Sequence, residues 1–152
     1  MNTLLAALHY LALGIGFTGV ILRGMEFKRL GRSAAEGDLK RLFLADNLWG
    51  VGAVLWIATG LTRAFAGFEK GTDYYLSSHW FWLKMVLFGG MFLLEAWPMI
   101  TLIRWRMAKK TSVSQNDRAM LSRFFSINLA QIHFLVAIIF VASAMSRGGF
   151  HF

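Results

Sequence analysis

Four long apolar runs alternate with polar segments along the chain, at about residues 4–22, 42–65, 79–103 and 124–145. Each run is close to, or longer than, the roughly 20 helical residues that cross the hydrocarbon layer of a bilayer. Their apolar residues are continuous rather than alternating, which favours helices over the strands of a β-barrel. The pattern therefore predicts an all-α protein, a four-transmembrane-helix up-down bundle that forms a single integral membrane domain over residues 1–152.

Composition and charge agree with a membrane protein. Hydrophobic residues make up 57% of the chain and charged residues only 16%, whereas about a quarter of the residues of a soluble domain are charged. The Lys and Arg residues gather in two segments, between the first and second runs and between the third and fourth: Arg23, Lys28, Arg29, Arg32, Lys40, Arg41, Arg104, Arg106, Lys109, Lys110, Arg118 and Arg123. By the positive-inside rule both segments face the cytoplasm and both termini lie outside. The net charge of +8 then indicates lipid headgroups, and not nucleic acid, as the partner.

Two charged residues, Lys84 and Glu95, lie within the third apolar run. They are eleven residues apart, close to three helical turns, so both project from one face of the helix. Each charge costs something like 2.5–3.5 kcal/mol at the centre of a bilayer. That face is therefore expected to point into the bundle, toward a partner or toward a cofactor.

The predicted topology gives each polar residue an approximate depth. His9 and Lys84 fall in the outer half of the membrane, which predicts an outer polar level. Arg23, Asp46 and Glu95 fall in the inner half, which predicts a buried charge network in which Arg23 pairs with Asp46 or Glu95. Such a network either fixes the register of the helices or forms part of a functional site, and the sequence leaves both hypotheses open.

Histidine is the residue type here that can hold a cofactor, because the chain has no cysteine and so no thiolate ligand. Two axial ligands of haem b need imidazoles on opposite sides of the porphyrin at similar depth. His9 and His133 form the best pair of metal ligands, with an expected offset of roughly 6 Å in height. His133 lies about 140° around its helix from Asn128, so one of the two faces turns away from the bundle centre. This spacing indicates a homo-oligomer or a partner in a membrane complex.

Four segments resemble an uncharacterised family of predicted four-span bacterial inner-membrane proteins. They are LHYLALGIGFTGVILR (8–23), ADNLWGVGAVLWIATGLTRAF (45–65), KGTDYYLSSHWFWLKMVLF (70–88) and EAWPMITLIRWR (95–106). The resemblance implies a multi-pass protein of the bacterial cytoplasmic (inner) membrane. It implies no activity, because that family has none assigned.

The layout is also distantly similar to the haem-containing four-helix protoporphyrinogen IX oxidases of bacteria and to the copper-resistance D-type membrane domains. In those oxidases a helix-one histidine and a lysine early in helix three are the functional pair, and b-type haem is bound. His9 and Lys84 stand at the matching places, and Arg23 matches an arginine that closes helix one. The resemblance thus implies Lys84 and Arg23 as candidate catalytic residues.

Three functions remain open at this stage. The first is a membrane b-haem redox protein that acts on a porphyrin or quinone-like substrate, with His9 and His133 as haem ligands and Lys84 beside a propionate or an anionic substrate. The second is a cofactor-free proton- or solute-coupled membrane protein with a polar path lined by Lys84, Glu95 and Asp46. The third is an accessory or structural subunit of a larger membrane complex. Only the first makes the chain an enzyme, a membrane oxidoreductase.

Overall fold

A computed structural model describes residues 2–32, 38–66 and 72–146. These residues form five helices: α1 (Asn2–Arg32), α2 (Lys40–Phe65), α3 (Thr72–Ser77), α4 (His79–Met107) and α5 (Gln115–Ser146). All but α3 are long and apolar enough to cross a membrane. The prediction of an all-α fold with four membrane-spanning helices is therefore confirmed. Which end of the bundle faces the cytoplasm stays a prediction.

The spanning helices reach further than the apolar runs, mainly at the end where the basic residues gather. α1 continues to Arg32 and α5 already begins at Gln115. Lys, Arg and Glu are good helix formers, and the added turns bury apolar residues such as Phe27, Leu30 and Leu121. Hydropathy alone ended the helices too early because it detects the hydrocarbon layer and not the helical turns beyond it.

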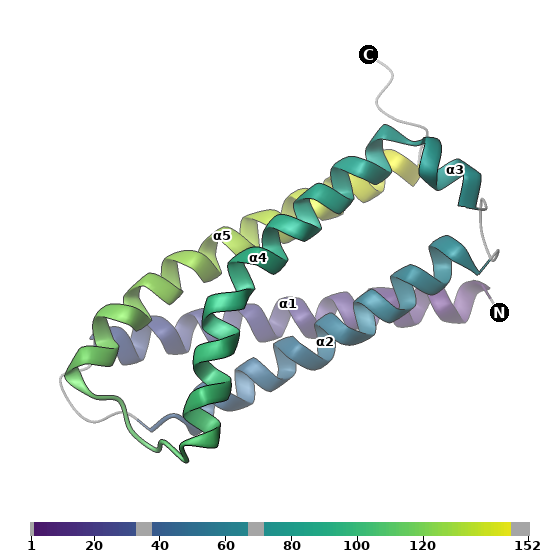
Figure 1. The fold of residues 1–152 in the computed structure, drawn as a ribbon. Coiled ribbons are helices and arrows are strands. Elements are labelled where there is room, and N and C mark those ends of the chain that lie inside the picture. The colour runs from purple at the N-terminus through teal and green to yellow at the C-terminus, as the bar shows by residue number, and fades with distance from the viewer. Residues whose placement is uncertain (1, 33–37, 67–71, 147–152) are drawn as a thin grey trace.

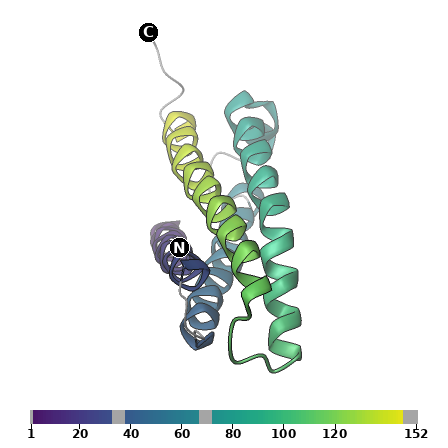
Figure 2. The same cartoon turned by 90° about the vertical axis from the view of Figure 1, so that its left-hand side faces the viewer.

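The helices lie in an antiparallel arrangement in which α1 packs against α2 and α5, and α4 packs against α5. Figure 1 shows the start of α1 and the end of α5 at the end of the bundle that carries α3. The end of α1, the start of α2 and the segment between α4 and α5 lie at the opposite end, called the basic end below. Figure 2 shows the α4–α5 pair beside the α1–α2 pair.

Glycines bring α1 and α2 together. A Cβ atom added to Gly52 would overlap the backbone nitrogen and Cα of Gly16, and one added to Gly19 would overlap the backbone of Trp49. Small residues are the usual means by which membrane helices approach closely, because lipid offers no hydrophobic driving force between them. The α1–α2 pair is therefore a backbone-to-backbone contact.

Side chains, in contrast, join α2 to α4. The rings of Phe65 and Phe81 meet edge to face with centroids 6.3 Å apart, and those of Trp56 and Phe88 do so at 6.0 Å. Edge-to-face aromatic pairs at this spacing are favourable beyond their burial alone. α2 and α4 thus pack through large rings, and the core between them is aromatic.

The short helix α3 lies where the sequence predicted only a loop. Its Tyr75 is buried and packs with Ala64 and Phe81 in a small apolar cluster. The ring of Tyr74 stands edge to face on that of Tyr75, and its hydroxyl donates to the carbonyl of Met145 at 3.2 Å. α3 therefore closes the end of the bundle opposite the basic end.

Candidate functional site

Arg23 lies at the centre of the bundle with no exposed surface. Its Nε donates to Asn128 Oδ1 at 3.1 Å, and its Nη1 donates to Asp46 Oδ1 at 3.0 Å and to Glu95 Oε1 at 2.6 Å. Its Nη2 donates to Glu95 Oε2 at 2.7 Å and to Gln131 Oε1 at 3.0 Å. A guanidinium has five N–H donors, and all five are used. One side chain of α1 therefore ties together α2, α4 and α5.

The acceptors around Arg23 are themselves held in place. Gln131 Nε2 donates to Glu95 Oε2 at 2.6 Å, and Asn128 Nδ2 donates to the carbonyl of Val20 at 2.9 Å. Asn128 reaches this carbonyl because α1 has Gly24 there, where a Cβ atom would lie 2.6 Å from the amide nitrogen. Buried polar groups that are fully hydrogen-bonded specify one arrangement of their helices.

Arg106 extends the network toward the basic end. Its Nη2 donates to Asp46 Oδ2 at 2.7 Å and to the carbonyl of Phe43 at 3.2 Å. The Arg106 side chain is 34% exposed, whereas those of Asp46 and Glu95 are 13% and 12% exposed. Two guanidinium groups thus face two carboxylates, and the network is electrically balanced. We call these four residues, with Asn128 and Gln131, the Arg23 network.

Two aromatic rings shield the Arg23 guanidinium from water. The Arg23 guanidinium lies 5.6 Å from the Phe27 ring centroid and 5.5 Å from that of Trp49. These rings belong to two different apolar clusters, one toward the basic end and one in the middle of the bundle. In such a low-dielectric surrounding both the attraction within ion pairs and the penalty of an unpaired charge are large. The site is therefore strongly sensitive to the loss of any one charge.

His9 and Lys84 lie nearer the α3 end, and each contacts an aromatic ring. His9 Nδ1 shares a hydrogen bond of 2.8 Å with the Thr59 hydroxyl, and the imidazole stacks on Trp56 with centroids 5.8 Å apart. The Lys84 ammonium lies 5.6 Å from the centroid of Phe81 on its own helix. The pairing of His9 with Lys84 in an outer polar level stays a prediction.

His133 faces away from the Arg23 network. It is exposed, and its Nδ1 shares a 2.7 Å hydrogen bond with the Leu129 carbonyl of the preceding turn. Asn128 and Gln131 are the polar residues of α5 that turn inward. The helical spacing had indicated that one of these faces looks outward, and the structure shows that it is the face of His133.

Haem b does not fit between His9 and His133 of one chain. Leu135 lines the same hollow as Gly16, so His133 lies roughly two and a half turns, or about 13 Å, nearer the basic end than His9. That hollow has a volume of about 10 Å³, far too small for a porphyrin. Among residues 2–32, 38–66 and 72–146, no three His, Asp or Glu side chains form a metal site. Haem binding therefore stays a prediction from the distant resemblance.

Arg106 is the charged member of the Arg23 network that the sequence did not predict, because it was counted with the basic segment. It follows Glu95 by eleven residues, as Glu95 follows Lys84. Three residues spaced in this way lie on one face of a helix. The same argument that selected Lys84 and Glu95 would have selected Arg106.

Comparison with known proteins identifies the family of the chain and goes no further. Neither the curated proteins nor the solved structures contain a match, so the distant likeness to haem oxidases rests on the short motifs alone. The model of one protein family, described as "Predicted membrane protein (DUF2214)", matches residues 1–149. The match spans all four membrane helices. The chain therefore belongs to this family of predicted membrane proteins.

Proposed function

We propose that the chain is a cofactor-free, proton-coupled membrane protein and that Glu95 is the group that takes up and releases the proton. The observation that carries the proposal is the fully buried Arg23, which spends two of its five hydrogen bonds on the Glu95 carboxylate. Ionisable residues inside a membrane bundle are expensive and commonly mark proton relays or ion pathways. A structural tie between helices needs no such charges.

Protonation of Glu95 changes the balance of the Arg23 network. With the carboxylate ionised, two cations face two anions; with a proton on Glu95, two cations face Asp46 alone. Glu95 joins α4 to α1 and Arg106 joins it to α2, so proton uptake loosens the attachment to α1 and leaves that to α2. Because α2 and α4 meet through side chains rather than backbones, α4 is the helix that this step frees to move.

The proposed path brings protons to Glu95 from the basic end. Asp46 bridges Arg23 and Arg106, and Arg106 is partly exposed, so polar groups lead from the surface to the buried guanidinium. Toward the α3 end, an apolar cluster that includes Val20, Trp49 and Met91 lies next. The arrangement therefore suits alternating exposure of Glu95 rather than an open channel.

Glu95→Gln is expected to abolish proton flux in a protein that is less stable but still folded. Glutamine keeps an oxygen acceptor for Arg23 but cannot ionise at this position. The measurement is the decay of an imposed pH gradient in proteoliposomes that contain a pH-sensitive dye, and the variant is expected to match protein-free liposomes. Size-exclusion elution and helix content check the fold.

Glu26→Gln is the matched control for Glu95→Gln. It removes the same charge from an acid that pairs with Arg29 of its own helix, outside the Arg23 network, and its flux is expected to equal that of the unmodified protein. Equal flux in both variants, or no flux above protein-free liposomes in the unmodified protein, would contradict the proposal and leave the Arg23 network as a structural tie.

Self-association is a second proposal, which rests on the outward face of α5. Ser126, His133 and Phe140 recur every seven residues on it and are all exposed. His133 Nδ1 donates to the Leu129 carbonyl, which leaves Nε2 as an acceptor that the Ser126 hydroxyl of a second copy can satisfy and lipid cannot. His133→Leu is expected to shift the protein from dimer to monomer in mild detergent, measured by light scattering. An unchanged mass would argue against this interface.

Haem-dependent redox chemistry stays an alternative from the distant resemblance. One observation beside His9 favours a bound group there, because the buried indole N–H of Trp56 has no hydrogen-bond partner within the described ranges. Oxidised and reduced absorption spectra of the purified protein test it. A Soret band that disappears in His9→Ala would replace the proton-coupled proposal, and a colourless protein made with ample haem would remove the redox one.

A further inference from the structure

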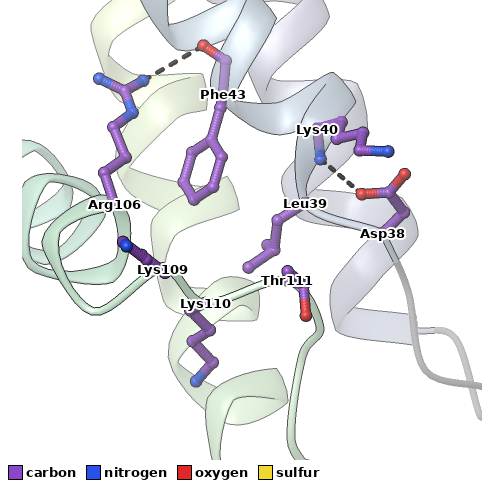
Figure 3. Close-up of a pocket in the computed structure, with 8 residues that line it drawn as sticks. All are labelled: Asp38, Leu39, Lys40, Phe43, Arg106, Lys109, Lys110 and Thr111. Carbon is purple, nitrogen blue, oxygen red and sulfur yellow. Dashed lines mark hydrogen bonds between the residues drawn. The ribbon is translucent and has the colours of Figure 1, made fainter.

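A cavity of about 350 Å³ opens at the basic end, between the start of α2 and the end of α4. Figure 3 shows the Phe43 ring and Leu39 between Arg106, Lys109 and Lys110 on one side and Lys40 on the other. A volume of this size lies in the range of small-molecule sites. The proton path proposed above meets this cavity at Arg106, and the other residues that line the cavity have no part in that path.

The floor of the cavity is apolar and its rim is cationic. Leu39 is fully buried, and its N–H donates to the Thr111 carbonyl at 3.3 Å, which ties the start of α2 to the segment after α4. Among the residues that the structure describes, four cations and one acid, Asp38, line the cavity. The Asp38 carboxylate accepts the backbone N–H of Lys40 at 2.9 Å. The rim therefore carries an excess of positive charge.

Two of the four cations are already engaged. Arg106 pairs with Asp46, and Lys110 pairs with Asp117 while its ammonium lies 4.5 Å from the Trp105 ring centroid. The side chains of Lys40 and Lys109 are exposed and form no ion pair with any described residue. These two ammonium groups are therefore available to bind an anion.

The backbone holds Lys109 in an unfavourable conformation. Its φ is 50°, in the left-handed region that favours glycine. The N–H of Lys109 donates to the Arg106 carbonyl at 3.0 Å, and the N–H of Lys110 donates to the Trp105 carbonyl at 2.9 Å. This pattern ends a helix with a left-handed residue that is usually glycine. A lysine at such a position gives up stability, and strain of this kind tends to persist at functional sites.

We propose that this cavity binds the headgroup of an anionic phospholipid. The cavity lies where α2 begins and α4 ends, and therefore at the depth of the headgroups. The phosphate sits between Lys40 and Lys109, and the glycerol and first acyl carbons lie on Leu39 and Phe43. A soluble phosphate would use the rim but leave the apolar floor bare, which is why a lipid fits better. Basic pockets between membrane helices are suited to such headgroups.

The test compares two double variants of the full chain in neutral detergent. Lys40→Gln/Lys109→Gln removes the two unpaired ammonium groups, and Arg41→Gln/Arg104→Gln removes two exposed cations of the same end that do not line the cavity. Binding is measured by native mass spectrometry during titration with phosphatidylglycerol. The cavity variant is expected to bind about 25-fold more weakly, roughly fivefold for each lysine, and the control less than twofold more weakly.

Three further ligands and one further variant separate the sources of the phosphate and the effects on folding. Phosphatidylcholine, glycerol phosphate and inorganic phosphate are expected to bind at least tenfold more weakly than phosphatidylglycerol. Lys109→Gly is expected to raise the melting temperature, because glycine adopts φ of 50° without strain, and still to weaken lipid binding about fivefold. Equal losses in the two double variants, or equal binding of the soluble phosphates, would overturn the proposal.

Discussion

Arg23→Met is expected to lower the free energy of unfolding by about 3–5 kcal/mol. The variant leaves Asp46 and Glu95 facing each other's charge in a buried site, with Arg106 as their remaining cation. It also orphans the amide oxygens of Asn128 and Gln131. Titration of the purified protein in mixed micelles with a denaturing detergent measures the loss. A change below about 1 kcal/mol would show that the Arg23 network carries little of the stability.

The control for Arg23→Met is Arg29→Met. Arg29 pairs with Glu26 three residues earlier on α1, and its side chain is 43% exposed. Exposed pairs of this kind contribute about 0.5 kcal/mol or less, so the control is expected to change stability little. The contrast separates the loss of a buried partner from the loss of an arginine on the same helix.

A double variant tests whether unpaired charge is the cause. Arg23→Met/Glu95→Gln removes one cation and one anion, and the remaining Arg106 and Asp46 balance each other. The pair is expected to be less destabilising than the sum of its two single changes, with a coupling of about 1–3 kcal/mol. Simple additivity would indicate that the two side chains act independently, against the geometry of their two hydrogen bonds.

The spanning helices could be predicted because hydropathy over 20 residues responds to a single physical requirement. A helix in lipid must satisfy its own backbone and expose apolar side chains, and each run of this chain does so. The short helix α3 could not be found in this way. Its order comes from Tyr75 packing on Phe81 and Ala64, which is a tertiary contact that no window along the sequence contains.

The candidate site could be predicted only in part. Depth and helical face select Arg23, Asp46 and Glu95, because the cost of a buried charge applies to each residue separately. Depth does not determine which side chains meet across the bundle. His9 and Lys84 have the same predicted depth. In the structure Trp56 stacks on His9 and also contacts Phe88, which lies one turn along α4 from Lys84. Which aromatic side chains fill the space between two helices depends on their packing, and the sequence carries no periodic pattern that predicts it.

Gly52→Ala is expected to destabilise the bundle by about 1–3 kcal/mol, although alanine is the better helix former. The new Cβ atom would overlap the backbone of Gly16 on α1, and a backbone cannot rotate away as a side chain can. α1 and α2 must therefore move apart. Trp49, one turn earlier on α2, lies against the Arg23 guanidinium, so the displacement reaches the Arg23 network. The measurement is the same denaturing-detergent titration.

Gly50→Ala is the matched control, two residues away on the same helix. Nothing lies within 4 Å of a Cβ atom added at Gly50, so the substitution changes only helix propensity and is expected to stabilise the protein by up to about 1 kcal/mol. Both variants replace glycine by alanine, but their changes in stability are expected to have opposite signs. If both were neutral, α1 and α2 would not be in backbone contact at Gly52. If both were destabilising, a partner would cover Gly50, and the outer face of α2 would be an interface rather than a lipid-facing surface.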